Sequence, residues 1–277
     1  MIKLIWEKFL KRFFLYVSII FITVTMLLPF FVMLAVSFTP EGNITGILNG
    51  FTPTLQNWKN VFSQIPVSRY FFNSLFVSTL TTIGQVLFSA LAGFAFARMN
   101  FKGKNILFYT FLLSMMVPPQ VNIVPLFWII SKLGLINTYP ALILPGIFGG
   151  FGVYMMRQFF LSFPKDIEES ARIDGASLLK TFFTIVLPLA SPALITLAIF
   201  TFIATWNSFM WPLIATNTED MRTFALGLAV FKGSLRELTL WGELMVCCTI
   251  CTIPAIIIFI FLKKYLISDI AAGSVKE

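Results

Sequence analysis

Residues that could do chemistry are scarce in this chain of 277 residues, which contains 12 Asp and Glu and no His. Three of the acids, Asp166, Glu168 and Glu169, stand close together in one polar stretch. The chain has no His, and no nucleophile stands near these acids with a base to activate it. The three acids therefore do not form an acid–base set for catalysis. Acids in the first turn of a helix are favoured by the helix dipole, and Glu168 with Arg172 has the better order for an exposed pair. The cluster predicts a charged, exposed helix, and we expect no enzymatic activity.

A helix–turn–helix would position these acids. Ser162 and Pro164 favour a helix start, as an N-cap and a first-turn residue. The pair Asp174-Gly175 favours a stop, because glycine tolerates the left-handed conformation that ends a helix. A second helical run is expected from Ala176 to Val186. The alternative is an ordinary solvated loop between two membrane spans.

The stretch also carries a motif at fixed separations: Glu169-Ser170-Ala171, then Gly175, then Ile185-x-Leu187-Pro188. It resembles the EAA loop of permease subunits in binding-protein-dependent ABC importers. From about Phe51 onward the chain is similar to the carbohydrate branch of that family, the maltose type. Ser170 stands where the family usually has Ala.

The resemblance implies that this loop inserts into a cleft on a cytoplasmic ATPase, where Glu169 pairs with a basic residue. Gly175 would permit the turn and Ala171 a close approach, while Ile185 and Pro188 would anchor the next span. The expected coupling residues are Glu169, Ser170, Ala171, Asp174, Gly175, Ile185, Leu187 and Pro188.

Implied partners are a second permease subunit in a heterodimer, an ATPase dimer and an extracytoplasmic sugar-binding protein. This chain has no Walker A sequence, since Gly103-Lys104-Asn105 lacks the glycine spacing and the Ser or Thr. We therefore expect no cofactor here, with ATP and Mg bound by the ATPase. We expect a multi-pass protein of a prokaryotic inner or plasma membrane.

Composition supports membrane insertion, with 58% hydrophobic residues, 12% charged residues and a mean hydropathy of +0.89. Soluble domains carry about twice that charged fraction. A helix needs about 20 apolar residues to cross the hydrocarbon. Candidate spans are Phe13–Phe38, Phe71–Ala97, Asn105–Ile130, Thr138–Phe160, Leu189–Ile214 and Leu240–Leu262.

The fold class expected is therefore an all-α polytopic membrane protein with six transmembrane helices and the type I ABC importer permease fold. Residues 1–70 would form the N-terminal segment, first helix and external loop. Residues 71–265 would form the permease core with its coupling loop at 161–188. Residues 266–277 would form a cytoplasmic tail.

Orientation follows from the Lys and Arg residues. With a cytoplasmic N-terminus, fourteen of the 20 fall on inside segments and six on outside segments, which favours both termini inside. The coupling loop then faces the cytoplasm. The net charge of +8 is spread over short loops and does not indicate nucleic-acid binding.

Small residues and prolines in the spans predict a kinked, closely packed bundle. Gly146-x-x-x-Gly150 and Ser89-x-x-x-Gly93 favour close helix approach. Pro118-Pro119 and Pro188 are among the prolines that interrupt spans, which is tolerated where protein or a water-filled cavity satisfies the backbone.

Few charges fall within the spans. Arg98, Arg157 and Lys263 are expected to snorkel at cytoplasmic ends. Glu243 lies one turn into the last span at interfacial depth, and we hypothesise that it lines the substrate path. Cys247, Cys248 and Cys251 most simply fill space in that helix.

The run Thr205-Trp206-Asn207-Ser208 resembles a carbohydrate-permease sequence in which an acid usually replaces Ser208. Trp206 and Asn207 could offer an aromatic face and amide hydrogen bonds to a sugar. The alternative is an interfacial aromatic belt.

The function expected is the permease subunit of an ATP-driven sugar importer, for an oligosaccharide. Three alternatives stay open. One is a permease for another solute, such as polyamines; the others are an autonomous ion-coupled carrier and a membrane enzyme.

Overall fold

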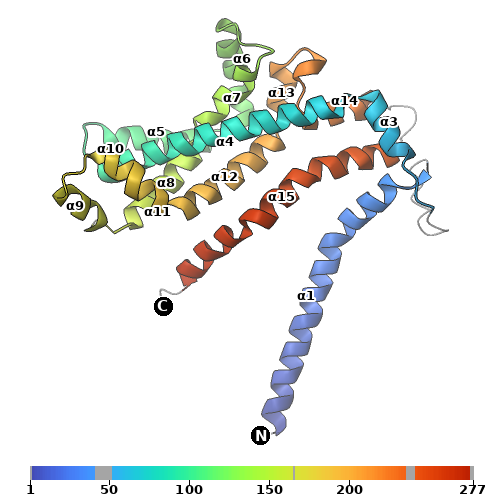
Figure 1. Ribbon diagram of the computed structural model, residues 1–277, viewed down its shortest axis with the longest axis horizontal. Helices are drawn as coiled ribbons and strands as arrows, with labels where there is room; N and C mark the ends of the chain where they lie inside the picture. The colour runs from blue at the N-terminus through green and yellow to red at the C-terminus, as the bar shows by residue number, and fades with distance from the viewer. Residues whose placement is uncertain (1, 41–51, 165, 235–240, 275–277) are drawn as a thin grey trace. The chain divides into compact units, whose positions relative to one another are not determined.

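The computed structural model describes the chain except residues 1, 41–51, 165, 235–240 and 275–277. It has two compact units, one of residues 1–66 with 228–253 and one of residues 67–227 with 254–277. Within the described residues, every regular element is a helix (Figure 1).

Among the described residues, four stretches are long and apolar enough to cross a membrane: Leu10–Ser37, Val67–Arg98, Tyr139–Ser162 and Trp241–Leu262. They correspond to α1 (Ile2–Ser37), α4 (Val67–Arg98), α7 (Tyr139–Ile147) with α8 (Gly150–Ser162), and α15 (Trp241–Ser274). Two bent helix pairs bring the total to as many as six if each pair is one span. The described residues thus contain between four and six candidate spans, against the six expected.

The first bent pair joins α5 (Lys104–Met116) to the short helix η2 (Pro119–Asn122) and α6 (Ile123–Lys132), with an angle of 101° at the break. The break coincides with Pro118-Pro119, because proline supplies no backbone donor to continue a helix. The span expected at 105–130, with an interruption at Pro118-Pro119, is sharply bent at that point.

The second bent pair contains α10 (Leu178–Thr181), a π-helix (Phe182–Val186), α11 (Leu187–Leu189) and α12 (Ser191–Trp206), with a bend of 74°. The helical run passes through Pro188 and breaks at Ala190, later than expected, because proline fits the first turn of a helix. The expected span 189–214 is also divided, since α13 (Met210–Ala215) is a separate helix.

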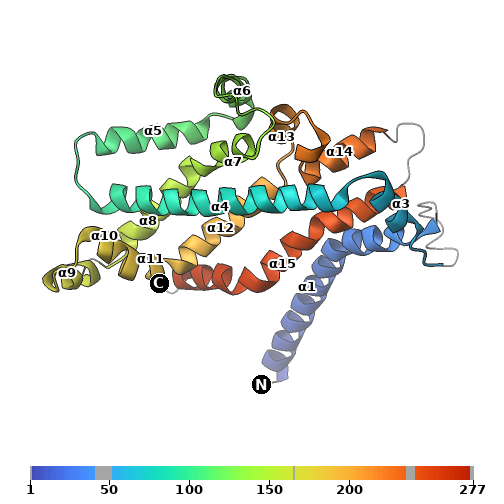
Figure 2. The same ribbon diagram turned by 45° about the horizontal axis from the view of Figure 1, so that its top comes forward.

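The core of the second unit lies where α4 packs on α8 and α12 (Figure 2). Glycines allow the close approach of α4 and α8. A Cβ atom at Gly93 would lie 2.7 Å from the Cβ of Met156 and 2.8 Å from the backbone nitrogen of Arg157. One at Gly152 would overlap the hydroxyl of Ser89. The predicted small-residue packing is confirmed.

The N-terminal end of α4 holds the loop that follows α13. The side-chain amide of Asn73 donates to the carbonyl oxygens of Asp220 and Arg222 at 2.7 and 2.9 Å. Tyr139 donates to the side-chain oxygen of Asn73 at 2.7 Å. This network supplies hydrogen-bond partners to the buried side-chain amide of Asn73, at the junction of α4, α7 and the short helix η4 (Glu219–Met221).

In the first unit, a polar cluster joins α3 (Gln56–Gln64) to the start of α15 and the end of α1. Asn57 donates to the carbonyl oxygens of Ser37 and Thr39 at 3.1 and 2.8 Å. Asn60 donates to Glu243 at 2.7 Å. α14 (Phe224–Ser234) precedes the segment 235–240, which lies outside the described residues.

Candidate functional site

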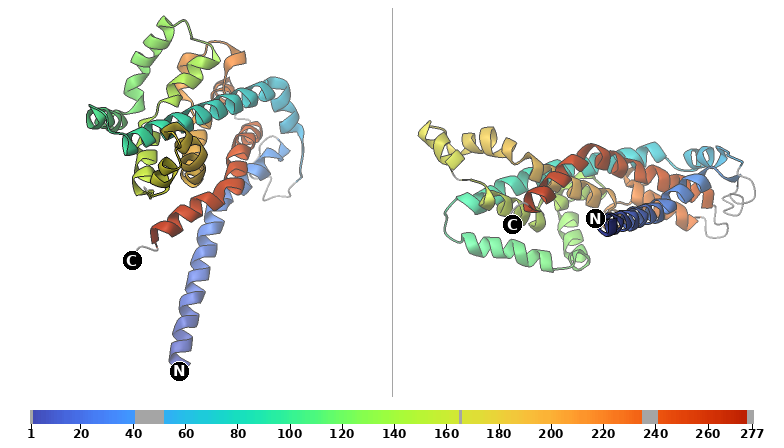
Figure 3. Two further views of the ribbon diagram at one scale, coloured as in Figure 1. Left: turned by 60° about the vertical axis from the view of Figure 1, so that its left-hand side comes forward. Right: turned by 90° about the horizontal axis from the view of Figure 1, so that it is seen from below.

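The acidic helix α9 (Asp166–Ile173) lies near the C-terminal end of α4 (Figures 1 and 3). Its first turn holds Asp166, Glu168 and Glu169, as expected. The helix starts after Pro164, however, and Ser162 is the last residue of α8. Its hydroxyl donates back to the carbonyl of Phe159 at 2.8 Å, so the predicted cap role of Ser162 is wrong.

A glycine turn ends α9. Gly175 has φ +78°, a left-handed conformation that a Cβ atom disfavours. The amide of Ala176 donates to the carbonyl of Ala171 at 2.9 Å and that of Asp174 to Ser170 at 3.1 Å. This hydrogen-bond pattern closes a helix end at a glycine. The predicted helix–turn–helix is confirmed, with α10 as its second helix.

The two sides of α9 have different surroundings. Glu169, Ser170 and Asp174 are exposed, and Ile173, next to the turn, is 86% exposed. Ala171, in contrast, is 6% exposed and is covered by this chain. Ala171, which was expected to allow close approach to a partner, therefore packs within this chain. Glu169, Asp174 and Ile173 are exposed and can contact another protein.

An ion pair that the sequence analysis missed fixes α9 to α4. The guanidinium of Arg98 donates to Glu168 at 2.6 Å and to the carbonyl of Phe163 at 2.6 Å. The side chains of Arg98 and Glu168 are 6% and 16% exposed. Arg98 therefore does not snorkel, and Glu168 takes a partner from a distant helix. The side chain of Arg172, its expected partner, lies outside the described residues.

The anchor of the coupling loop also differs from the expected one. Pro188 is exposed, and Ile185 and Leu187 are half-buried. The buried residues are Phe182 and Val186, which pack on α4 and α8. The ring of Phe182 lies 4.9 Å from that of Phe94. Phe182 and Val186 are four residues apart in an apolar run, and this spacing could have predicted that they share a helix face.

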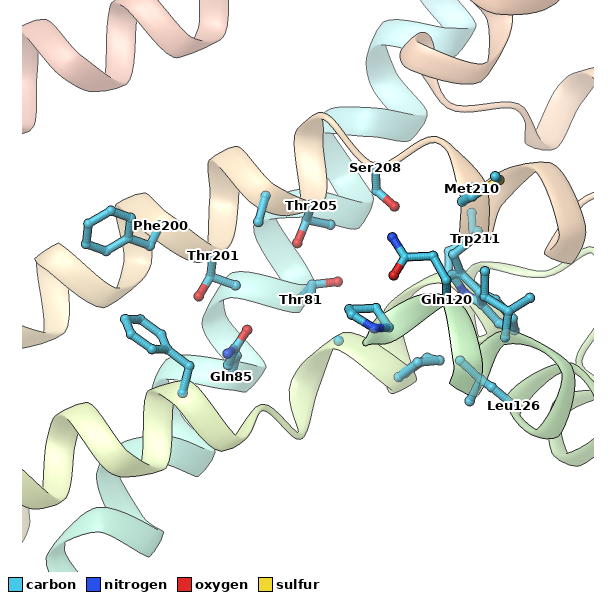
Figure 4. A pocket seen from close by; sticks show the side chains of 17 residues that line it. Thr81, Gln85, Gln120, Leu126, Phe200, Thr201, Thr205, Ser208, Met210 and Trp211 are labelled. Carbon is cyan, nitrogen blue, oxygen red and sulfur yellow. The ribbon is translucent and has the colours of Figure 1, made fainter. Parts of the chain in front are cut away.

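The second unit also contains a cavity of about 660 Å³, bordered by α4, α12, α13, α7, α8 and the bend between α5 and α6 (Figure 4). Its polar lining consists of Thr81, Gln85, Gln120, Thr201, Thr205 and Ser208. Its lining includes no Asp, Glu, Lys or Arg among the residues that the structure describes. Such a cavity can offer hydrogen bonds without attracting a charged ligand.

The expected path residues lie elsewhere. Trp206 is 2% exposed, with its ring stacked on Phe202 at 6.0 Å and edge-on to Phe71 at 5.4 Å. It is neither part of the cavity lining nor an exposed belt residue. Asn207 is exposed just after α12. The contact of both residues with substrate stays a prediction.

Glu243 is 2% exposed in the first turn of α15. Besides Asn60, the amide of Gln64 donates to its carboxylate at 3.4 Å. The helix start and the two amides satisfy this buried carboxylate. Its role in the substrate path likewise stays a prediction.

The bent apolar spans, together with an exposed acidic helix held against their core, define a membrane-embedded transport subunit. Residues 85–271 match the family described as binding-protein-dependent transport system inner membrane component. The chain belongs to this family, and it is accordingly an inner-membrane protein.

Relatives extend the match over nearly the whole chain. The chain is 37% identical to the trehalose/maltose transport system permease protein MalG of Thermococcus litoralis, over 98% of this chain and 99% of that protein. It is 35% identical to the arabinooligosaccharides transport system permease protein AraQ of Halalkalibacterium halodurans, over 92% and 93%. The fold is similar to a crystal structure of a bacterial ABC transporter involved in the import of the acidic polysaccharide alginate. That similarity has a TM-score of 0.77 and 21% identity, over 92% of this chain and 96% of the other.

Proposed function

We propose that this chain is a permease subunit of an ATP-driven importer for a sugar, and more narrowly for an oligosaccharide. The relatives named for trehalose, maltose and arabinooligosaccharide transport support the substrate class. The Mycobacterium tuberculosis trehalose transport system permease protein SugB, 32% identical over 90% of this chain, supports it further.

The observation that carries the coupling proposal is the division of α9 into a held side and a free side. Arg98 binds Glu168 on the held side. Glu169 and Ile173 remain exposed on the free side. A charged group beside an apolar one can enter a cleft on another protein, where a basic residue would pair with Glu169. That protein would be a cytoplasmic ATPase dimer, which would bind the ATP and Mg.

Closure of the ATPase would move α9, and the chain has rigid contacts through which that motion could travel. The ion pair with Arg98 leads to α4, and the packing of Phe182 leads to the core of α4 and α8. Alternating access would follow from movement of these helices against a second permease subunit, expected to form a heterodimer with this one.

An extracytoplasmic sugar-binding protein would deliver substrate to the outer loops, residues 39–70 and 215–239. Residues 41–51 and 235–239 of these loops lie outside the described part of the chain.

Reconstitution tests the proposed function. Proteoliposomes containing both permeases, the ATPase and the binding protein should accumulate radiolabelled maltose, trehalose or an arabinooligosaccharide when ATP is supplied. Omitting the ATPase should abolish accumulation. Uptake by the permeases alone would instead indicate an autonomous carrier, and ATP-driven uptake of a polyamine but no sugar would indicate the other permease class.

A further inference from the structure

The cavity of the second unit has a mostly apolar lining, in which several uncharged side chains can donate or accept hydrogen bonds. The hydroxyls come from threonine and serine, and the amides come from Gln85 on α4 and Gln120 on η2. Figure 4 shows Thr201 and Thr205 of α12 beside Thr81 and Gln85 of α4, with Ser208 and Gln120 at the other end.

One of these groups, the hydroxyl of Thr81, is buried. Its oxygen has no hydrogen-bond partner among the residues that the structure describes, although Thr81 is almost fully buried. Buried polar groups are normally satisfied by protein, water or ligand. Because Thr81 lines the cavity, rotation of its side chain would offer this hydroxyl to a polar ligand there.

Glycines hold the polar groups of α4 against the cavity wall. A Cβ atom at Gly146 would lie 2.5 Å from the methyl group of Thr81, and one at Gly149 would overlap the amide of Gln85. Both glycines belong to the α7–α8 stretch, which borders the cavity. Their lack of a side chain therefore sets where Thr81 and Gln85 stand.

Aromatic rings form part of the apolar lining. The indole N–H of Trp211 donates to the carbonyl of Ala141 at 2.9 Å, which fixes the orientation of that ring. Phe151 and Phe200 meet edge to face with centroids 6.2 Å apart. Fixed aromatic faces next to amides and hydroxyls suit a ligand with alternating C–H and O–H groups, as in a sugar ring.

We infer that this cavity is a substrate subsite for a neutral saccharide, carried by this chain itself. The inference rests on the proposed function and adds its ligand chemistry. The described lining offers no cation to offset the hydration that an anionic sugar would lose on entering. It also offers no carboxylate to pair with the ammonium groups of a polyamine. The cavity volume of about 660 Å³ falls in the range of about 300–1,000 Å³ found for small-molecule sites.

Cysteine protection in the assembled transporter tests the subsite. Cys247, Cys248 and Cys251 are first replaced by serine, and Gln120 is changed to cysteine. Gln120 is exposed in the cavity wall, so Gln120→Cys disturbs no packing. A hydrophilic thiol reagent is applied with and without a non-hydrolysable ATP analogue. Maltose, trehalose, an arabinooligosaccharide and an acidic alginate oligosaccharide are compared.

At least one neutral sugar should slow the labelling of Gln120→Cys by about tenfold, in either nucleotide state, as expected for hydrogen bonds worth more than about 1 kcal/mol. The acidic oligosaccharide should not slow it. The matched control is Gln158→Cys on the exposed side of α8, where no sugar should change the rate. Equal protection by the acidic oligosaccharide, equal slowing at both positions, or no protection at all would overturn the inference.

Measurements of sugar uptake distinguish a failure of this inference from a failure of the proposed function. Gln120→Leu should lower sugar uptake by about tenfold, while Gln158→Leu should not. If the unmodified complex shows no ATP-driven sugar uptake, the proposed function fails. If it transports sugar normally while Gln120→Leu transports equally well and Gln120→Cys is unprotected, only the subsite fails.

Discussion

At the scale of single residues, Glu168 and Glu169 are neighbours in sequence with different surroundings. Glu168 is half-buried and paired with Arg98, whereas Glu169 is exposed. Successive residues on a helix point in directions about 100° apart, so adjacent acids can serve two different surfaces. We expect Glu168 to hold α9 in place and Glu169 to meet the ATPase.

Substitution of each acid by glutamine distinguishes the two roles. Glu168→Gln leaves the buried charge of Arg98 unpaired, and we expect it to cost about 3 kcal/mol of stability. It should lower the thermal unfolding temperature of the purified permease in detergent.

Glu169→Gln should leave that unfolding temperature unchanged and lower ATP-driven uptake at least about tenfold, because losing one partner of an interfacial charge pair costs about 2–5 kcal/mol. The exchange of Arg98→Glu with Glu168→Arg should recover part of the lost stability. Equal unfolding temperatures for Glu168→Gln and Glu169→Gln would contradict this assignment.

At the scale of elements, α4 connects the two candidate sites. It runs without a break from Val67 to Arg98, and so carries Thr81 of the cavity and Arg98 of the coupling loop on one helix. Those residues are about 26 Å apart at 1.5 Å per residue. A displacement of α9 would therefore reach the cavity through a single rigid element.

The close packing of α4 on α8 can be tested at two glycines of α4. Gly93→Ala places a Cβ atom against the backbone of α8, so the helices must separate at a cost of about 1–3 kcal/mol. A Cβ atom at Gly84 would lie 2.8 and 2.9 Å from Cγ1 and Cδ1 of Ile147, so that side chain must shift, but the nearest atoms include no backbone. Alanine itself favours a helix by about 1 kcal/mol over glycine, which offsets part of this cost. Gly93→Ala should lower the unfolding temperature in detergent by more than Gly84→Ala does, because a side chain can shift where a packed backbone cannot. A larger loss for Gly84→Ala would refute this packing argument.

The turn after α9 can be tested at Gly175. Gly175→Asp forces a side chain into the left-handed region, at about 1–2 kcal/mol, and adds a charge next to Asp174 in the chain. We expect this variant to reach the membrane in normal amounts and to lose ATP-driven uptake.

Gly103→Asp is the matched control, because Gly103 has φ +82°, equally open surroundings and a predicted cytoplasmic position outside the coupling loop. It should retain uptake. Normal uptake by Gly175→Asp, with its amount in the membrane verified by immunoblot, would remove the loop from the coupling pathway.

At the scale of the whole molecule, the orientation predicted from Lys and Arg places α9 in the cytoplasm and the loop around Asn217 outside. Glu169 and Asn217 are both exposed, and α4 runs between the regions that contain them. The two ends of a membrane-spanning helix face opposite sides of the bilayer.

Site-directed labelling of intact cells tests this orientation. In a chain whose three native cysteines are replaced, an impermeant thiol reagent should label Asn217→Cys from outside. Glu169→Cys should be labelled only after the membrane is opened. Labelling of Glu169→Cys in sealed cells would invert the orientation and remove the proposed contact with the ATPase.

Local patterns in the chain were sufficient for several features of the structure. Apolar runs predicted the spans because the thickness of the hydrocarbon sets their length. Asp174-Gly175 predicted the end of α9 because only the local backbone conformation is involved. The spaced glycines predicted close helix approach, and the resemblance of the motif predicted the family.

Contacts between distant segments could not be read in the same way. The pairing of Arg98 with Glu168, the burial of Trp206 and the gathering of Thr81, Gln85 and Gln120 depend on how bent helices pack. Spacing along one helix says which residues share a face but not which other face they meet. The amino-acid order thus specified the spans, the turn and the exposed acids, each set by neighbours in the chain. Packing alone chose the partner of each buried polar group and the lining of the cavity, because those depend on residues brought together from far apart.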